Sequence, residues 1–254
     1  MSYFVFEHKR LYYHESGTGR PLLFLHGNTA SSNMYAQIAD RYKRDFNVML
    51  LDFLGHGKSD RLSEFPADLW FYEARQVIAL IKEKGYTDVN VIGSSGGAMV
   101  ALNVALEAPE LVGKVIADSF EGEKPNRVFT ENLLTDRERA KSDQQARMFY
   151  AYMHGSDWEQ IVDHDTSALL RHEKEIGCFF HRPLHSLKAD ILLTGSREDE
   201  FMSAVSDNYL ECVYEEIIQK IGHGRIHLFA SGGHPAMMTN QEAFYRISKA
   251  FLLG

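Results

Sequence analysis

Short apolar runs recur along the chain, and each is followed by a small or polar residue and then a loop. Such runs are typical of strands that are buried on both faces of a sheet. They are PLLFLHG, NVMLLDF, VNVIGS, KVIADS, DILLTGS and RIHLFAS. Near the N-terminus, YFVFEH and LYYHES predict two further strands, joined by a tight turn at Lys9 and Arg10.

Amphipathic patterns with helical spacing lie between most of these runs. They cover Ser31–Lys43, Leu69–Lys84, Ala98–Glu107, Ser203–Ile221 and Gln241–Leu253. Strands that alternate with helices predict a mostly parallel sheet covered on both faces, joined by right-handed crossovers. We therefore expect an α/β fold.

One stretch, from about Phe120 to Leu187, interrupts the alternation. It contains no convincing buried strand and reads as a series of amphipathic helices, in which Tyr150, Met153 and Trp158 suggest one apolar face. We see no repeat, low-complexity tract or linker that would divide the chain. The expected organisation is one domain, with a core formed by 1–119 and 188–254 and a helical cap formed by 120–187.

Composition and charge narrow the classes of partner. The chain has 254 residues and a formal net charge of −8, which argues against nucleic acid or an anionic membrane as a partner. The two cysteines, Cys178 and Cys212, have no spacing typical of a disulfide framework or a metal site, and this fits a reducing compartment. We find no signal peptide and no apolar run of bilayer length, so we expect a cytoplasmic protein. A small molecule is the expected partner, and a homodimer is possible.

The sequence GSSGG places Ser95 at the end of a predicted buried strand and directly before a predicted helix. In a strand–turn–helix corner of the G-x-S-x-G type, the serine hydroxyl is exposed and the flanking glycines avoid clashes between strand and helix. The next amide, that of Gly96, then lies at a helix N-terminus, where it can face developing negative charge. A glycine-rich corner can also serve close packing alone, but its context favours a nucleophile.

A serine nucleophile needs a base, and the chain has 12 histidines. His234, in the loop after RIHLFA, is the candidate because that loop lies at the same sheet edge as Ser95. The histidines of the cap lack a metal-ligand spacing, and we expect no metal. The base in turn needs an acid. Asp199 is the choice after DILLTGS, with Glu198 and Asp118 as competitors.

The loop HGNTASS, after the strand PLLFL, is expected to complete an oxyanion hole. His26 and Gly27 let this loop bend back over the nucleophile, and the amide of Asn28 is the second donor beside that of Gly96. We expect His26 to hold the loop by hydrogen bonds rather than to act as a base. The second glycine–histidine loop, LDFLGHGKSD, is expected to shape a turn.

Four blocks in this order, HGNTASS, DFLGHGKS, GSSGG and GGHP, resemble the α/β-hydrolase superfamily across nearly the whole chain outside the insertion. The resemblance implies an eight-stranded, mainly parallel sheet with a helical cap after the sixth strand. It implies Ser95 as nucleophile, Asp199 as acid, His234 as base and the amides of Asn28 and Gly96 as oxyanion donors. The chain departs from the family pattern at Ser94, where histidine is frequent, and in an acid loop that is one residue longer.

The resemblance leaves the substrate open. A serine nucleophile argues against dehalogenases and epoxide hydrolases of this fold, which use an aspartate. The broadest expectation is hydrolysis of small carboxylic esters or thioesters without a cofactor. The alternatives are a carbon–carbon bond hydrolase and a slowly reacting ligand receptor with the cap as its partner surface. Cofactor-free perhydrolases and acyltransferases also remain open.

Six aromatic residues and one methionine of the insertion can form an apolar roof above the site, provided that several of them face the cleft. The alternative, which we favour, is that most of them pack the cap onto the core. The set consists of Phe149, Tyr150, Tyr152, Met153, Trp158, Phe179 and Phe180.

Overall fold

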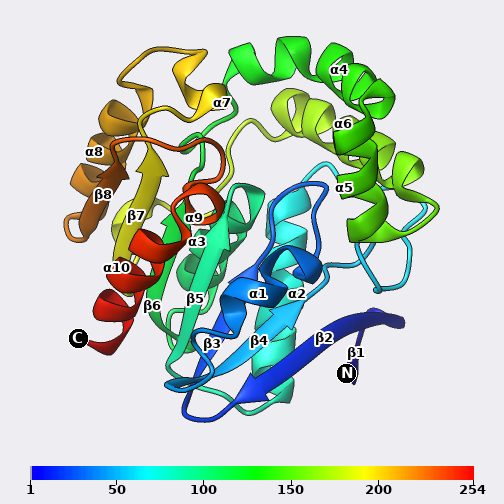
Figure 1. Ribbon diagram of the computed structural model, residues 1–254. Coiled ribbons are helices and arrows are strands. Elements are labelled where there is room, and N and C mark those ends of the chain that lie inside the picture. The colour runs from blue at the N-terminus through cyan, green and yellow to red at the C-terminus, as the bar shows by residue number, and fades with distance from the viewer. Residues whose placement is uncertain (1) are drawn as a thin grey trace.

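The computed structural model describes residues 2–254 and is built on one eight-stranded sheet (Figure 1). The strand order is β1-β2-β4-β3-β5-β6-β7-β8. Strand β1 is antiparallel to β2 and β2 is antiparallel to β4, whereas all the other neighbours are parallel. The strands are β1 (Ser2–Phe6), β2 (Lys9–Gly17), β3 (Arg20–Leu25), β4 (Phe46–Leu51), β5 (Val89–Ser94), β6 (Val112–Asp118), β7 (Asp190–Ser196) and β8 (Arg225–Phe229). The expected mostly parallel sheet is confirmed.

Helices cover both faces of the sheet because successive side chains of a buried strand point to opposite faces. The core helices are η1 (Ser32–Tyr35), α1 (Ala36–Ala39), α2 (Leu69–Glu83), α3 (Gly96–Glu107), α7 (Glu200–Ser203), α8 (Tyr209–Ile221), α9 (Ala236–Thr239) and α10 (Gln241–Leu253). In β3, Leu23 and Leu25 belong to the core cluster that includes residues of α2, α3 and α8, whereas Leu22 and Phe24 belong to the cluster that includes residues of α1 and α10. Within residues 2–254, no helix combines the length and the apolar character needed to cross a membrane.

The first hairpin turns two residues earlier than expected. Strand β1 ends at Phe6 and β2 begins at Lys9, so the two turn residues are Glu7 and His8 rather than Lys9 and Arg10. Both have a positive φ, of 48° and 66°, as the favoured two-residue hairpin turns of the type I′ class require. The predicted turn position was wrong because neither residue is one of the glycines or asparagines that usually mark such turns.

Two expected helices are shorter or broken. In place of one helix over Ser31–Lys43, a 3₁₀ turn and the single helical turn α1 end at Ala39. In place of one helix over Ser203–Ile221, α7 ends at Ser203 and α8 begins at Tyr209. The first of these segments begins where the Ser31 hydroxyl accepts the N–H of Asn33. Side-chain bonds of this kind compete with regular helix.

Three helices lie between β6 and β7 and cover one end of the sheet in Figure 1. They are α4 (Arg127–Ser142), α5 (Gln144–His154) and α6 (Trp158–Glu175), followed by the 3₁₀ turn η2 (Leu184–Ser186). We call α4, α5 and α6 the cap. Strands β6 and β7 are parallel neighbours, so the chain leaves for the cap at the carboxyl end of β6 and returns to the amino end of β7. The cap itself lies at the carboxyl ends of the parallel strands, where His154 of α5 bonds to Thr29 in the loop after β3. This is the end of the sheet at which ligands bind in such folds.

Replacement of Gly97 by alanine is expected to destabilise the fold without touching a reactive group. A Cβ at this position would lie 2.0 Å from the carbonyl oxygen of Leu25, so α3 would have to move away from β3. We expect a loss of about 3 kcal/mol, the upper part of the usual range for overpacking, and a melting temperature lower by roughly 10 °C. Thermal unfolding followed by circular dichroism measures this.

Gly85→Ala is the control for this prediction. Gly85 has a positive φ, of +65°, and a Cβ there meets nothing within 4 Å. Its cost is therefore backbone strain alone, about 1 kcal/mol. Equal melting temperatures for the two variants would contradict the close approach of α3 to β3.

Candidate active site

Ser95 lies in the turn between β5 and α3 with a strained backbone. Its φ is 56°, in the left-handed region that residues with a side chain rarely adopt. The turn is fixed by the N–H of Ser95, which donates to the Asp118 carbonyl at 2.8 Å, and by the absence of a Cβ at Gly93, where one would lie 2.0 Å from the Gly97 carbonyl oxygen. The glycines of this corner are therefore needed for the close contact of strand and helix.

The structure brings Ser95, His234 and Asp199 into one hydrogen-bonded chain. The Ser95 Oγ lies 2.9 Å from His234 Nε2, and His234 Nδ1 lies 2.8 Å from Asp199 Oδ2. Because a carboxylate accepts hydrogen bonds, Nδ1 carries the proton of the neutral ring and Nε2 is free to accept the serine proton. Asp199 is fully buried and His234 is mostly buried. The arrangement is able to activate the serine hydroxyl.

Asp199 is held in place by the start of α7. Its Oδ1 accepts the backbone N–H groups of Phe201 and Met202, at 3.1 and 3.3 Å, which leaves Oδ2 for the histidine. The next residue, Glu200, accepts the backbone N–H of His234 at 2.9 Å. Two consecutive carboxylates therefore position the histidine, one through its ring and one through its backbone.

The two competing acids do not bond to the His234 ring. Glu198 is exposed. Asp118 is buried below the nucleophile turn, where it accepts from Thr194, Ser94 and the backbone N–H of Met237. Burial raises the pKa of Asp118 to about 6, against the lowering effect of these hydrogen bonds. These contacts show that Asp118 supports the nucleophile turn and is not bonded to the His234 ring.

Asn28 and Gly96 lie close together beside Ser95. The Cα of Gly27 lies so close to the nucleophile turn that a Cβ on it would be 2.9 Å from the Ser95 Cβ. In residues 2–254, the backbone N–H of Asn28 has no hydrogen-bond acceptor. Gly96 is the first residue of α3, so its N–H has no acceptor within that helix. Two free amides are thus available near the serine oxygen.

His26 holds the loop that carries Asn28. Its Nε2 accepts the backbone N–H of Phe53 at 3.2 Å, so its Nδ1 carries the proton and donates to the Gly27 carbonyl at 2.9 Å. Burial lowers the pKa of this imidazole. Both ring nitrogens are occupied, which supports the expected structural role. In the neighbouring turn, the buried Asp52 accepts the backbone N–H groups of Ser32 and Lys58.

Thr29 is the second strained residue of the site. Its φ is 55°, and such a conformation costs a residue with a side chain about 1–3 kcal/mol. For a β-branched residue it is a true outlier. Its hydroxyl donates to the Asn28 carbonyl at 2.7 Å, and its other polar contacts come from the cap. The strain lies directly after the candidate oxyanion donor.

The expected apolar roof is only partly supported. Phe149 and Tyr152 are exposed on the outside of the cap. The remaining members are buried, but they pack against one another or against the core: Tyr150 stacks on Trp158 within the cap, and Phe179 and Phe180 belong to the main core cluster. Most of the seven residues therefore pack within the cap or attach its return segment to the core, which is the alternative that the sequence favoured.

His154 predicts a pH dependence of stability. It accepts the backbone N–H of Gly57 on Nδ1 at 3.1 Å, so its Nε2 donates to the Thr29 carbonyl at 2.9 Å. Burial lowers its pKa to about 4, from an ordinary value near 6.5. The folded protein therefore binds fewer protons than the unfolded chain between pH 6.5 and 4, and stability falls as the pH falls through that window. The loss is about 3 kcal/mol by pH 4.

Urea unfolding of wild type and His154→Gln at pH 7 and pH 4 measures this. Glutamine offers a donor and an acceptor but does not titrate, so the variant is expected to lose less stability than wild type on acidification. Other histidines and carboxylates contribute equally to both proteins. An identical loss in the two proteins would contradict the prediction.

Three contributors at the site were not found from the sequence. Asp165 of α6 accepts from the Asn28 side chain, Arg137 of α4 donates to Thr29, and Trp70 of α2 donates to Asn28. The partners are separated by 137, 108 and 42 positions in the chain. No local motif marks such contacts, so no signal in a single sequence was available to find them.

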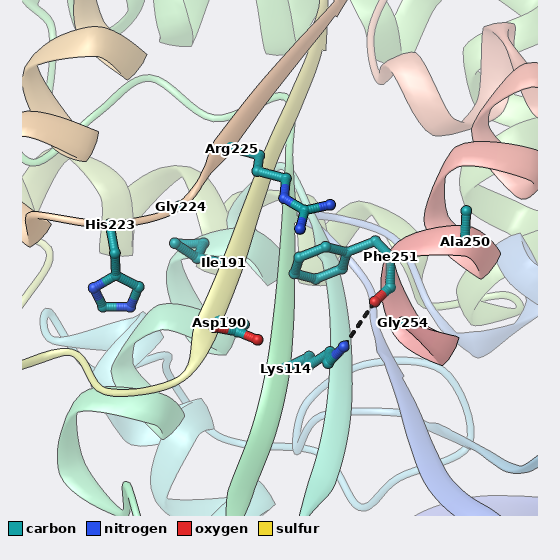
Figure 2. Close-up of a pocket in the computed structure, with 9 residues that line it drawn as sticks. All are labelled: Lys114, Asp190, Ile191, His223, Gly224, Arg225, Ala250, Phe251 and Gly254. Atoms are coloured by element: carbon teal, nitrogen blue, oxygen red, sulfur yellow. Dashed lines mark hydrogen bonds between the residues drawn. The ribbon is translucent and has the colours of Figure 1, made fainter.

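A hollow at the opposite edge of the sheet is separate from this site. It lies at the amino ends of β6, β7 and β8 beside the last turns of α10, where Lys114 donates to the Phe251 carbonyl at 2.9 Å (Figure 2). Ser95, in contrast, follows the carboxyl end of β5. As for metals, the described residues contain no group of three histidine, cysteine or acidic side chains placed to hold an ion.

Comparisons with known proteins agree with this fold. A family model for the alpha/beta hydrolase fold matches residues 20–175. A 2-hydroxy-6-oxo-6-phenylhexa-2,4-dienoate hydrolase from Comamonas testosteroni is 26% identical, over 95% of this chain and 91% of its own. A serine hydrolase from the polyaromatic hydrocarbon-degrading bacterium Cycloclasticus zankles has a similar structure, with a TM-score of 0.82 at 19% identity, over 100% of this chain and 97% of its own. An esterase from Exiguobacterium antarcticum has a similar structure, with a TM-score of 0.74 at 18% identity, over 97% of this chain and 96% of its own.

Proposed function

This chain belongs to the alpha/beta hydrolase fold family and is a hydrolase, and from that premise we propose that it cleaves small carboxylic esters or thioesters through an acyl-enzyme on Ser95. The observation that carries the proposal is the unbroken chain of hydrogen bonds from Ser95 through His234 to the buried Asp199. The two free amides beside it, of Asn28 and Gly96, support the same reaction.

The proposed reaction has two steps. In the first, Ser95 Oγ attacks the acyl carbon while His234 Nε2 takes the hydroxyl proton, and the amides of Asn28 and Gly96 donate to the oxyanion. Each donor is worth about 3 kcal/mol in the transition state. The alcohol or thiol leaves with the proton from His234. In the second step, His234 takes a proton from water, the hydroxide attacks the acyl-enzyme, and the acid is released as the proton returns to Ser95.

Asp199 has a supporting role in both steps. It fixes the ring tautomer in which Nε2 accepts, and it stabilises the positive imidazolium that forms when the serine proton is taken up. The backbone contacts of Asp199 and Glu200 hold the ring at that orientation. A group fixed in advance in this way needs no reorganisation during the reaction.

Carbon–carbon bond hydrolysis is the second candidate. It is favoured by sequence similarity to two hydrolases from Comamonas testosteroni, whose names specify 2-hydroxy-6-oxo dienoate-type compounds, at 26% and 25% identity. Both candidates require the same three side chains, because each breaks a bond to a carbonyl carbon. The substrate, rather than the residues around Ser95, separates them.

The test compares two substrate types on the same protein. We expect turnover of p-nitrophenyl esters of graded acyl length, with a kcat/KM at least about tenfold above that for 2-hydroxy-6-oxo-6-phenylhexa-2,4-dienoate. The reverse order would move the assignment to carbon–carbon hydrolysis. A fluorophosphonate probe that labels Ser95 in a protein without repeated turnover of either substrate would indicate a slowly reacting receptor instead.

A further inference from the structure

All three helices of the cap contact the loop that carries the candidate oxyanion donor. The side-chain Nδ2 of Asn28 donates to Asp165 Oδ1 of α6 at 2.7 Å. The Thr29 hydroxyl oxygen accepts from the Arg137 guanidinium of α4 at 3.0 Å. The Thr29 carbonyl accepts from His154 of α5 at 2.9 Å. The contacts therefore converge on two consecutive residues.

Two of these cap residues also bond to each other. Arg137 donates to Asp165 Oδ2 at 3.0 Å, and the Asp165 side chain is fully buried. Each carboxylate oxygen thus accepts one donor, from Asn28 on one side and from Arg137 on the other. A buried pair of this kind is sensitive to loss of either partner, because the remaining charge is left without a counter-charge.

The side chain of Asn28 is fixed from three directions. Besides its bond to Asp165, its Oδ1 accepts from Trp70 Nε1 at 3.3 Å. The same oxygen lies 2.1 Å from the position that a Cβ on Gly96 would take. The Asn28 amide group therefore sits between α2, α6 and the first residue of α3. A side chain held at its far end in this way restricts movement of the backbone that carries it.

We propose, on the basis of the function proposed above, that Asp165 and Arg137 are positioning residues for the oxyanion hole. The cap holds Thr29 in its strained conformation and fixes Asn28, so that the Asn28 amide points with that of Gly96 to the place where negative charge develops. Oxyanion donors act only when they are in position before the reaction. The rate of the chemical step therefore depends on a docked cap.

Two substitutions test this, with one matched control. Asp165→Asn keeps the size of the side chain but replaces one acceptor oxygen by an NH₂ group. Either Asn28 or Arg137 then faces a donor instead of an acceptor. Arg137→Met keeps the apolar stem and removes the guanidinium. Asp163→Asn makes the first change two residues away on the same helix, where Asp163 is 57% exposed and pairs with Lys141.

We expect both test variants to lower kcat on a p-nitrophenyl ester by roughly 10- to 100-fold, less than the loss of a whole oxyanion donor. KM is expected to stay within about threefold, because the ground state does not use these donors fully. An aliphatic trifluoromethyl ketone, whose adduct with Ser95 places an oxyanion in the hole, is expected to bind more weakly in proportion to the loss of kcat/KM. The control, Asp163→Asn, is expected to match wild type in kcat, in KM and in its affinity for the trifluoromethyl ketone.

A second readout does not require turnover. The chain has two tryptophans, so the ¹⁵N-labelled protein gives two indole N–H resonances, which Trp158→Phe assigns. In Asp165→Asn the Trp70 resonance is expected to shift and its proton to exchange faster with solvent, because its acceptor on Asn28 is released. The Trp158 resonance, at the start of α6, reports whether the cap itself remains folded.

The outcomes separate this proposal from the proposed function. A kcat within about threefold of wild type in both variants overturns the positioning role. So does a fall in kcat that is accompanied by a rise in KM and by loss of the Trp158 resonance, because that combination indicates an unfolded cap. If wild type shows no turnover that depends on Ser95, the function is wrong. In that case a Trp70 shift in Asp165→Asn, absent in Asp163→Asn, still supports the link between cap and loop, and an unmoved Trp70 resonance overturns it.

Discussion

Ser95→Ala is expected to lower kcat by about 10⁵-fold or more, because no other group can form the acyl-enzyme. Ser95 Oγ is the only non-hydrogen atom that this change removes, and the His234 ring keeps its bond to Asp199. The melting temperature is therefore expected to stay within a few degrees of wild type. Steady-state hydrolysis of a p-nitrophenyl ester, with thermal unfolding beside it, measures both quantities.

Combined variants sharpen this result. Residues that act as one unit show losses that do not add, so Ser95→Ala/His234→Ala is expected to be no slower than Ser95→Ala alone. A fluorophosphonate probe is expected to label wild type but neither variant. Ordinary turnover by Ser95→Ala would contradict the proposed reaction outright.

Asp199→Asn is expected to lower kcat by about 10⁴-fold, the loss seen when a histidine is held in the wrong tautomer. An asparagine NH₂ facing Nδ1 would favour the tautomer with the proton on Nε2, where the ring can no longer accept from Ser95. Asn at this position can still accept the N–H groups of Phe201 and Met202, which are bonded to Oδ1 in wild type. The loss is therefore expected mainly in kcat.

The two other acids near the site are the controls for Asp199. Glu198→Gln is expected to leave kcat within about threefold, since Glu198 is exposed and makes no contact with the ring. Asp118→Asn is expected to reduce stability, because Asp118 accepts three hydrogen bonds below the nucleophile turn. A larger loss of kcat from Asp118→Asn than from Asp199→Asn would move the role of the acid to Asp118.

Local patterns in the sequence predict those parts of the fold that depend on neighbours along the chain. The buried strands are continuous apolar runs, and the corner at Ser95 is marked by its glycines, so both could be expected from the residues alone. The same holds for His234, since a loop after a parallel strand must emerge at the edge where Ser95 lies. Asp199 was the expected acid, but the sequence left Glu198 and Asp118 as competitors, because only the structure shows which carboxylate faces the ring.

The remaining features depend on contacts that a local pattern does not contain. The helix expected over Ser31–Lys43 ends at Ala39 although its spacing of apolar residues continues. The bonds of Asp165 and Arg137 to the Asn28 loop join segments more than a hundred positions apart. The positive φ of Thr29 is equally invisible in the sequence, because threonine is not a residue that marks a left-handed turn.

The separation of Ser95 and His234 by 139 positions has a consequence for biosynthesis. A chain that emerges N-terminus first presents its nucleophile long before its base, and in that interval Ser95 is an ordinary alcohol. The base arrives only when β8, which pairs with β7 alone at the margin of the sheet, has been added. In a refolding experiment, the return of catalytic activity therefore reports the attachment of β8. A spectroscopic probe in the central strands would not detect that step.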